Sequence, residues 1–506
     1  MQCYNLFICI CVGAVLTSTA IEPLGYFPLS WIGLAPLWLG ILRFPKSRKK
    51  ICLYSISWGC IFYGISLFWI TNFHPLTWMG VSWLPSLLFA ISYWFVVSSV
   101  GGIFLAIWGL GLQFVVVRKY GLFTQILTAA SLWSCLELFF QSTPFWWISL
   151  ALTQSPSNLW VLQLNTISGS STIVILIVAV NGLIANLVHT DSQEQKFQLS
   201  KIILGIIFIS HLFGVLIYYL PDKKLDNSKI AIGIVQGDIP HETKFEPEGI
   251  DLAIKRYSQG YRRLIGKSVD GVLSPELAIP GLGQHPNIQD TDFFAQIKKH
   301  RKPLWIGTRT GDEENPKQSL IALEGNGLTA QYDKQKMVLF GETIPFFDTF
   351  LEPSIRKLFP FGMHHQIGNK KQIFNTPYGK AVVAICYESA YPQIFLSQVR
   401  TGGRFILVAT ADGLFGRNMM QQHHAQDVLR AIETGRWLVR ANSRDYSGVI
   451  DSKGNTEWIS KPGYLIHKAD IYSSDRKTIY VCFGNWITFV LIILSVYYVV
   501  VRNQRY

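Results

Sequence analysis

Apolar residues in the first half of the chain, and again at its end, form runs long enough to cross a membrane. A membrane-spanning helix needs about 20 consecutive apolar residues. Eight runs approach this length and predict eight spans, at residues 4–20, 26–43, 51–72, 82–117, 121–141, 166–189, 202–220 and 479–501. The fourth run is too long for one straight span, so it either tilts or contains a break near Gly101-Gly102.

The pattern changes after the seventh run, where short β-branched segments alternate with helical patterns. Such alternation predicts a layered α/β fold. The expected strands cover residues 229–236, 271–275, 303–308, 381–386 and 404–409, and a helix is expected over 419–435. The chain therefore divides into a transmembrane bundle (1–222), a soluble domain (223–476) and a final transmembrane helix (477–506).

The distribution of basic residues predicts the orientation of the spans. The loops near 21–25, 73–81 and 142–165 contain no lysine or arginine. Basic residues instead follow the second, fourth, sixth and eighth spans, at Arg43, Lys46, Arg48, Lys49, Lys50, Arg118, Lys119, Lys196, Lys201, Arg502 and Arg505. Because basic loops stay on the cytoplasmic side, the soluble domain between the last two spans is expected to face outward.

Composition supports a membrane protein and argues against a nucleic-acid partner. Charged residues make up only 15% of the chain and hydrophobic residues 49%, whereas soluble proteins carry about a quarter charged residues. The formal charge of +13 could suggest nucleic-acid binding. Much of the excess lies in short clusters beside apolar runs, where membrane topology explains it.

Cysteine usage singles out one residue. Seven of the eight cysteines lie in or directly beside the apolar runs, and Cys386 alone lies in the soluble domain. Domains outside the cytoplasm often pair their cysteines as disulfides, but a single cysteine cannot pair within its domain. Cys386 is therefore either an inert buried thiol or a nucleophile.

Candidate chemistry gathers at the ends of the expected strands. Glu276 follows one strand and Cys386 ends another, and reactive groups in α/β folds collect at the carboxyl ends of strands. A thiol reacts as thiolate, so it needs a base. A lysine can stabilise the oxyanion that forms next, and Lys334 and Lys336 are candidates after a further strand-like segment.

No metal site is predicted, because His423 and His424 are adjacent rather than at helical spacing and no cysteine accompanies them. Glu137 is a different case, since it lies inside the fifth span. Carboxylates within the membrane are costly and often functional. Glu137 could equally lie hydrated near the outer interface, and both interpretations stay open.

Three short motifs then appear in order: Ser274-Pro275-Glu276, Tyr332-Asp333-Lys334 and Ile385-Cys386-Tyr387-Glu388. They resemble the Glu–Lys–Cys pattern of the carbon–nitrogen hydrolase (nitrilase) superfamily. Val235-Gln236-Gly237-Asp238-Ile239-Pro240 and Phe340-Gly341-Glu342 narrow the match. With seven spans before the soluble domain and one after it, the chain resembles the apolipoprotein N-acyltransferase family over nearly its whole length.

The resemblance implies an outward-facing α-β-β-α nitrilase-like sandwich on a polytopic helical bundle, in a bacterial inner membrane with the sandwich in the periplasm. It implies that Glu276 is the general base, that Lys334 stabilises the tetrahedral intermediate and that Cys386 forms a thioester. The acyl donor would be a phospholipid, and the acceptor a diacylated lipoprotein. No cofactor is implied, and we expect a monomer surrounded by membrane lipid.

Further positions match the family less directly. Glu342, Glu388 and Tyr387 match positions that support the three catalytic residues. Weaker substrate-binding candidates are Phe245, Leu414 and His423. Several positions depart from the family pattern and leave acyl preference and rate open, namely Phe245, Leu339, Ala411, Leu414 and the turn Asn442-Ser443-Arg444.

Two other functions remain possible from the sequence. One is a membrane-tethered amidase or nitrilase that hydrolyses small amides, and the other is an inactive scaffold of the same family. The intact Glu–Lys–Cys set argues against the scaffold. The apolar segments Pro345-Phe346-Phe347 and Phe359-Pro360-Phe361-Gly362 are suited to dip into the membrane, although they could simply be packed.

Overall fold

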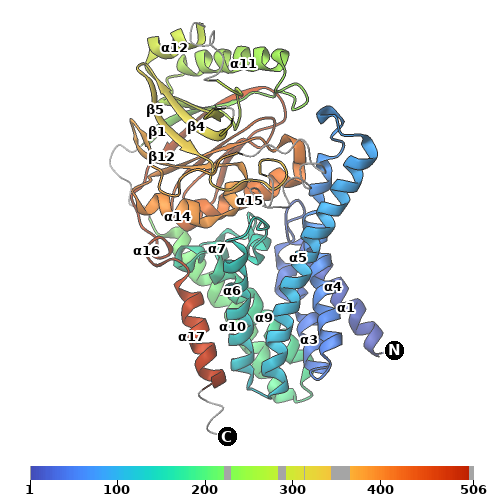
Figure 1. The fold of residues 1–506 in the computed structure, drawn as a ribbon. Helices are drawn as coiled ribbons and strands as arrows, with labels where there is room; N and C mark the ends of the chain where they lie inside the picture. The colour runs from blue at the N-terminus through green and yellow to red at the C-terminus, as the bar shows by residue number, and fades with distance from the viewer. Residues whose placement is uncertain (1, 222–228, 283–291, 313, 344–364, 501–506) are drawn as a thin grey trace. The chain divides into compact units, whose positions relative to one another are not determined.

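The computed structural model describes residues 2–221, 229–282, 292–312, 314–343 and 365–500. They form two compact units (Figure 1). The membrane unit comprises Met1–Leu76, Val81–Pro221 and Thr478–Tyr506, and the sandwich unit comprises Thr77–Gly80 and Asp222–Lys477. The expected boundary at 222/223 and the apolar segments 345–347 and 359–362 lie outside the described residues.

Each of the eight predicted runs contains a helix of the membrane unit. These helices are α1 (Gln2–Thr19), α3 (Ala35–Arg43), α4 (Arg48–Ser66), α5 (Trp83–Val117), α6 (Leu122–Phe140), α9 (Ser170–His189), α10 (Gln193–Tyr219) and α17 (Trp486–Val500). Short helices join them, namely α2 (Ser30–Gly33), α7 (Leu159–Leu162), α8 (Asn165–Ser168) and α16 (Ile479–Phe483). Within the described residues, α5, α6, α9 and α10 are long and apolar enough to cross a membrane.

Helix α5 continues through Gly101-Gly102, so the alternative of a break at this pair is wrong. Its 35 residues correspond to about 52 Å, which exceeds the ~30 Å hydrocarbon core. The glycines serve close packing instead. A Cβ atom added to Gly59 of α4 would lie 2.4 Å from the backbone oxygen of Gly101. Small residues at this crossing let the two helix backbones approach each other.

Glu137 of α6 is buried, and both oxygens of its carboxylate accept hydrogen bonds. Its carboxylate accepts hydrogen bonds from Trp133 Nε1 at 3.0 Å, Ser149 Oγ at 2.7 Å and the Leu150 backbone N–H at 2.8 Å. The last two donors lie at the start of a 3-10 helix, Leu150–Gln154. The Glu137 side chain therefore holds the segment that follows α6 against α6 itself. This arrangement favours a structural role for Glu137 over a hydrated surface position.

In the sandwich unit, the residues that the structure describes form two six-stranded sheets. The first has the order β12-β1-β2-β3-β4-β5 and the second β11-β10-β9-β8-β7-β6. The strands are β1 (Lys229–Gln236), β2 (Gly271–Leu273), β3 (Leu304–Thr310), β4 (Lys317–Glu324), β5 (Gly327–Asp333), β6 (Phe374–Thr376), β7 (Gly379–Ile385), β8 (Phe405–Thr410), β9 (Leu438–Asn442), β10 (Gly448–Ile450), β11 (Thr456–Ile459) and β12 (Leu465–Tyr472). All five expected strands are present, as β1, β2, β3, β7 and β8.

The two sheets face each other across one apolar core, and helices cover their outer faces (Figure 1). Alternate residues such as Val383 of β7 and Leu407 of β8 point into the core between the sheets, together with Ile232 and Trp305 from the first sheet. Helices α11 (Pro247–Ile265) and α12 (Asp292–His300) cover the first sheet, and α14 (Pro392–Arg400) and α15 (Arg417–Thr434) cover the second. The expected α-β-β-α order of layers is confirmed.

Parallel neighbours in each sheet bring several strand ends together. Strands β1, β2 and β3 are parallel, and so are β7, β8 and β9. Because β7 pairs with β8 up to Ile385 and Ala409, the residues that follow these two strands are neighbours. This is the edge at which α/β folds assemble their sites.

Candidate active site

Lys334 is the centre of a buried cluster of charges. It follows β5 and its side chain is fully buried. Its Nζ atom lies 2.8 Å from Glu276 Oε1 and 2.6 Å from Glu342 Oε1, and it also donates to Gln318 Oε1 at 3.3 Å. Burial alone would lower the pKa of Lys334, but the two carboxylates outweigh this effect and raise it well above its ordinary value. The side chain is therefore an ammonium ion at neutral pH.

Cys386 occupies a sharp turn directly after β7. It starts a 3-10 helix, Cys386–Ala390, and its φ of 51° is in the left-handed region. A non-glycine residue held there costs about 1–3 kcal/mol, and such residues cluster at functional sites. The side chain is 7% exposed. The thiol is thus held at the end of a buried strand with little access to solvent.

Burial and the neighbouring carboxylates keep this thiol protonated at rest. Burial raises the pKa of Cys386 well above its ordinary value, and the charges of Glu276 and Asp412 raise it further, while Lys334 opposes them. Burial likewise raises the pKa of Glu276, against the effect of Lys334. A carboxylate with a raised pKa is suited to take a proton from the thiol, because its pKa lies closer to the working pH.

The two supporting glutamates occupy different places. Glu342 contacts Lys334, and its second oxygen accepts the backbone N–H of Val338 at 2.9 Å. Glu388 is fully buried and anchors the turn around Cys386. It accepts hydrogen bonds from four groups, namely the backbone N–H of Ile385, Gln335 and Lys336 and the hydroxyl of Tyr332. Burial raises the pKa of Glu388 to about 7.

The other expected site residues are Tyr387, Phe245, Leu414 and His423. Tyr387 is half-buried and its ring packs edge-on against Tyr391, with centroids 5.2 Å apart. Phe245 is 43% exposed, and Leu414 is half-buried. His423 is buried, and its Nε2 lies 2.8 Å from the backbone oxygen of Cys386. Substrate contacts by Phe245, Leu414 and His423 stay predictions.

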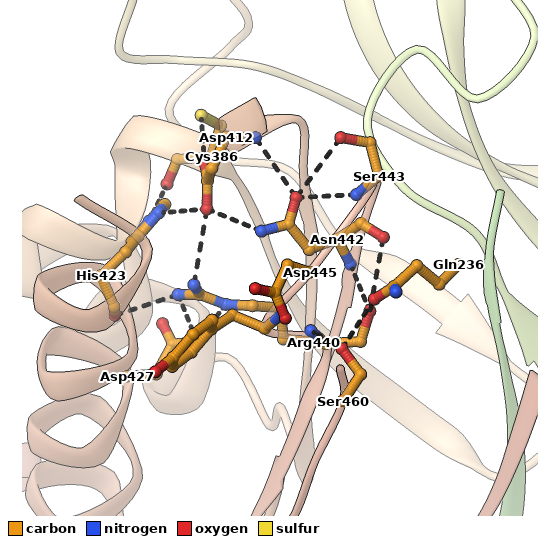
Figure 2. Close-up of polar contacts among 12 residues, drawn as sticks. Gln236, Cys386, Asp412, His423, Asp427, Arg440, Asn442, Ser443, Asp445 and Ser460 are labelled. Atoms are coloured by element: carbon orange, nitrogen blue, oxygen red, sulfur yellow. Dashed lines mark hydrogen bonds and ion pairs between the residues drawn. The ribbon is translucent and has the colours of Figure 1, made fainter. Parts of the chain in front are cut away.

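Two charged residues of the site were missed from the sequence. Lys244 is buried, and its Nζ donates to the backbone oxygen of Glu276 at 3.2 Å. Burial lowers the pKa of Lys244 to about 8. Asp412 is buried beside Cys386, with its Oδ1 at 3.4 Å from Sγ (Figure 2). The position of Asp412 three residues after the end of the predicted strand 404–409 was a usable signal, whereas Lys244 lies in a polar segment that resembles an exposed loop.

Across the described part of the chain, His, Cys, Asp and Glu side chains form no group of three or more that could hold a metal ion. The chemistry available at this centre is that of a thiol, a carboxylate and a lysine. Together these groups can activate a nucleophile, stabilise an oxyanion and pass a proton to a leaving group.

Comparison with known proteins matches both parts of the chain. Residues 13–183 match the family model for the apolipoprotein N-acyltransferase N-terminal domain, and residues 231–476 match the carbon–nitrogen hydrolase family. A Nostoc sp. apolipoprotein N-acyltransferase is 38% identical, with 94% of this chain and 95% of the relative covered. The Synechocystis sp. protein of the same name is 35% identical, with 94% of this chain and 96% of the relative covered. The Thermosynechococcus vestitus protein of that name is also 35% identical, with 95% of this chain and 92% of the relative covered. The chain therefore belongs to the apolipoprotein N-acyltransferase family.

Proposed function

We propose that this protein transfers a fatty acyl chain from a phospholipid to the α-amine of the N-terminal diacylglyceryl-cysteine of lipoproteins, through a thioester on Cys386. Full-length relatives named apolipoprotein N-acyltransferase support lipoprotein N-acylation. The observation that carries the proposal is the buried pair of Glu276 and Lys334, 2.8 Å apart, whose charges act on the Cys386 thiol. This arrangement supplies a base and an oxyanion-stabilising cation to one nucleophile.

In the first half-reaction, Glu276 takes the proton of the Cys386 thiol and the thiolate attacks the carbonyl carbon of the phospholipid ester. The oxyanion that forms is stabilised by the Lys334 ammonium group. The bond between the carbonyl carbon and the glycerol oxygen then breaks. Protonated Glu276 returns its proton to that oxygen, so a lysophospholipid leaves and a thioester remains on Cys386.

In the second half-reaction, the neutral α-amine of the lipoprotein attacks the thioester carbonyl carbon. Lys334 again stabilises the oxyanion, and Glu276 accepts the proton that the amine loses. The carbon–sulfur bond breaks, and the Cys386 thiolate recovers a proton from Glu276. The products are an amide on the lipoprotein and the resting thiol.

The protein is membrane-bound, and we propose a multi-pass arrangement in the bacterial inner membrane. Residues 1–222 would supply seven spans, 223–476 the periplasmic catalytic domain and 477–506 the eighth span. The long apolar helices α5, α6, α9 and α10 support a membrane bundle. The basic residues beside alternate spans support an outward catalytic domain. We further propose that the protein acts as a monomer.

Mass spectrometry of the purified protein after incubation with phospholipid alone tests this function. We expect a fatty-acyl adduct on Cys386 that hydroxylamine removes, and no adduct on the Cys386→Ala variant. Adding a diacylated lipopeptide should discharge the adduct and acylate the peptide amine. A folded protein that forms no adduct with any phospholipid tried, yet releases ammonia from small amides, would instead be an amidase. A folded protein with neither activity would be a scaffold.

A further inference from the structure

Asp412 contacts the Cys386 thiol but has no part in the proposed mechanism. It is the first residue of a 3-10 helix, Asp412–Phe415, just after β8. The side chain is fully buried, and Cys386 Sγ donates to Asp412 Oδ1 at 3.4 Å (Figure 2). Glu276, by contrast, comes from the first sheet. The thiol therefore has one carboxylate from each sheet in its surroundings.

The other carboxylate oxygen, Oδ2, is surrounded by donors. His423 Nδ1 lies 3.0 Å from it, Asn442 Nδ2 donates at 3.1 Å, and Arg440 Nη1 lies at 3.6 Å (Figure 2). Asn442 is itself oriented, because its Oδ1 accepts the backbone N–H of Asp412 and of Ser443. The side-chain amide must therefore turn its Nδ2 towards Asp412. These donors fix the carboxylate and leave Oδ1 for the thiol.

The surrounding groups also favour an ionised Asp412. Burial would raise the pKa of Asp412, but His423 and Arg440 outweigh burial and lower it below its ordinary value. His423 links the carboxylate back to the nucleophile, since its Nε2 lies 2.8 Å from the backbone oxygen of Cys386. Asp412 thus touches the side chain of Cys386 and is tied, through His423, to its backbone.

We propose that Asp412 is a positioning residue that orients the protonated Cys386 thiol and holds it unreactive until the acyl donor fills the site. The inference rests on the proposed role of Cys386 as nucleophile. When the donor binds, the S–H bond rotates from Asp412 towards Glu276 and the proton passes to Glu276, while Sγ keeps the position that Asp412 has set, and attack on the ester follows. Asp412 neither gains nor loses a proton in this step. The arrangement limits reaction of the thiol with other electrophiles while no lipid is present.

The proposal predicts opposite effects on two reactions of the same thiol. The charged groups that act on Cys386 are Glu276, Glu342 and Asp412, which disfavour the thiolate, and Lys334, which favours it; Lys244 also interacts with Cys386. Asp412→Asn removes one negative charge and keeps the shape. The pKa of Cys386 should fall, so that a small alkylating reagent reacts faster, because each unit of pKa changes the thiolate fraction about tenfold at pH values below it. Acylation by phospholipid should become slower, because the thiol is no longer oriented.

The experiment compares the unsubstituted protein, Asp412→Asn and Asp412→Glu. Iodoacetamide labelling without lipid is followed from pH 6 to pH 10 by mass spectrometry of the peptide that contains Cys386, because other cysteines such as Cys9, Cys135 and Cys482 are exposed. For Asp412→Asn we expect labelling at pH 7.5 to be about tenfold faster and thioester formation about tenfold slower. Asp412→Glu, which keeps the charge, should restore the labelling profile towards that of the unsubstituted protein.

A purely structural role for Asp412 would give a different result. Asp412→Asn would then slow or leave unchanged both reactions, with the labelling profile at the same pH, and that outcome overturns the proposal. If the unsubstituted protein labels as expected but forms no thioester with any phospholipid, the proposed function fails and the effect of Asp412 on the thiol still stands. The two failures are therefore distinguishable.

One measurement requires no substitution of Asp412 and covers the case in which Asp412→Asn does not fold. The infrared S–H stretching band of Cys386 is identified as the band that disappears in Cys386→Ser. In the resting protein this band should be shifted to lower wavenumber than that of a thiol without a hydrogen-bond acceptor. An unshifted band would show that the thiol does not donate to Asp412, and the proposal would be wrong.

Discussion

The carboxylate of Glu388 accepts the backbone N–H of Ile385 at 2.8 Å, one residue before Cys386. Its other oxygen accepts the backbone N–H of Gln335, one residue after Lys334, at 2.5 Å. A single buried side chain therefore ties the turn of the nucleophile to the turn of the lysine. The separation of Cys386 and Lys334 depends on this link between the two sheets, so we expect Glu388 to affect catalysis through the positions of these two residues.

Glu388→Gln should weaken both the fold and the site. A glutamine amide has one acceptor oxygen, so in either orientation a buried N–H of Ile385 or of Gln335 and Lys336 faces an NH₂ group. Each unpaired buried donor costs about 1–3 kcal/mol. We expect a lower Tm in detergent and at least tenfold slower thioester formation. Glu324→Gln is the matched control, because the hydrogen bond that Glu324 accepts from Thr329 Oγ1 at 3.2 Å can be kept by the amide oxygen. Equal effects of the two substitutions would contradict the role of Glu388.

The raised pKa of Glu388 predicts that the stability of the folded protein depends on pH. Burial raises the pKa of Glu388 from 4.5 to about 7 in the folded protein. Between these values the folded state binds a proton that the unfolded state has released, so the stability from this group is full below about pH 4.5 and is lost as the pH rises through about 7. Glu388→Gln cannot lose this contribution. The difference in Tm between the unsubstituted protein and the variant should therefore narrow from pH 5 to pH 8. If this difference in Tm widens from pH 5 to pH 8, folding lowers the pKa of Glu388 instead of raising it, and the prediction is wrong.

The strand ends that carry Glu276 and Cys386 could be predicted because their apolar β-branched runs are distinctive. The cluster around them could not, because sequence does not show which strands are neighbours. Asp412 reaches Cys386 only because β7 and β8 pair in parallel, with Ile385 opposite Ala409. Lys244 lies in a polar segment, and its burial depends on tertiary packing. The strands from β9 to β12 are short or flanked by polar residues, so no pattern identified them.

Lys334→Met should abolish thioester formation and also destabilise the sandwich unit. The ammonium group lies between two carboxylates, and removing it leaves the buried Glu276 and the partly exposed Glu342 as neighbouring like charges. Breaking a buried ion pair in this way costs about 3–5 kcal/mol. Lys317→Met is the control, since its pair with Asp333 at 3.1 Å is partly exposed and should contribute at most about 1 kcal/mol. Chemical denaturation and acyl-adduct mass spectrometry measure the two effects. If Lys334→Met forms the acyl adduct as fast as the unsubstituted protein, Lys334 has no part in the mechanism.

Lys244 should give acylation a descending limb near pH 8. Burial lowers the pKa of Lys244 to about 8, against the charges of Glu276 and Cys386, so the folded protein loses this cation as the pH rises through that value. The thiolate and the oxyanion then lose a nearby positive charge, and the rate falls. Lys244→Arg should move the limb to higher pH, and Lys244→Met should remove it with about tenfold slower acylation at pH 7. Lys255→Met, on the exposed face of α11, should leave the profile unchanged. If the acylation rate of Lys244→Met still falls near pH 8, another titrating group causes the fall and the prediction is wrong.

Gly307 of β3 holds the backbone of Glu276 in place, and this contact can be tested with one methyl group. A Cβ atom at Gly307 would lie 2.2 Å from the backbone oxygen of Pro275 and 2.7 Å from Cα of Glu276. Both obstructing atoms are backbone, so Gly307→Ala must displace the residue that carries the proposed base. A displacement of about 1 Å costs on the order of 100-fold in rate, and we expect acylation to fall at least tenfold. Gly266→Ala is the control, because its new Cβ would be 3.5 Å from the nearest atom. If Gly307→Ala acylates Cys386 as fast as Gly266→Ala, the position of Glu276 does not limit the reaction.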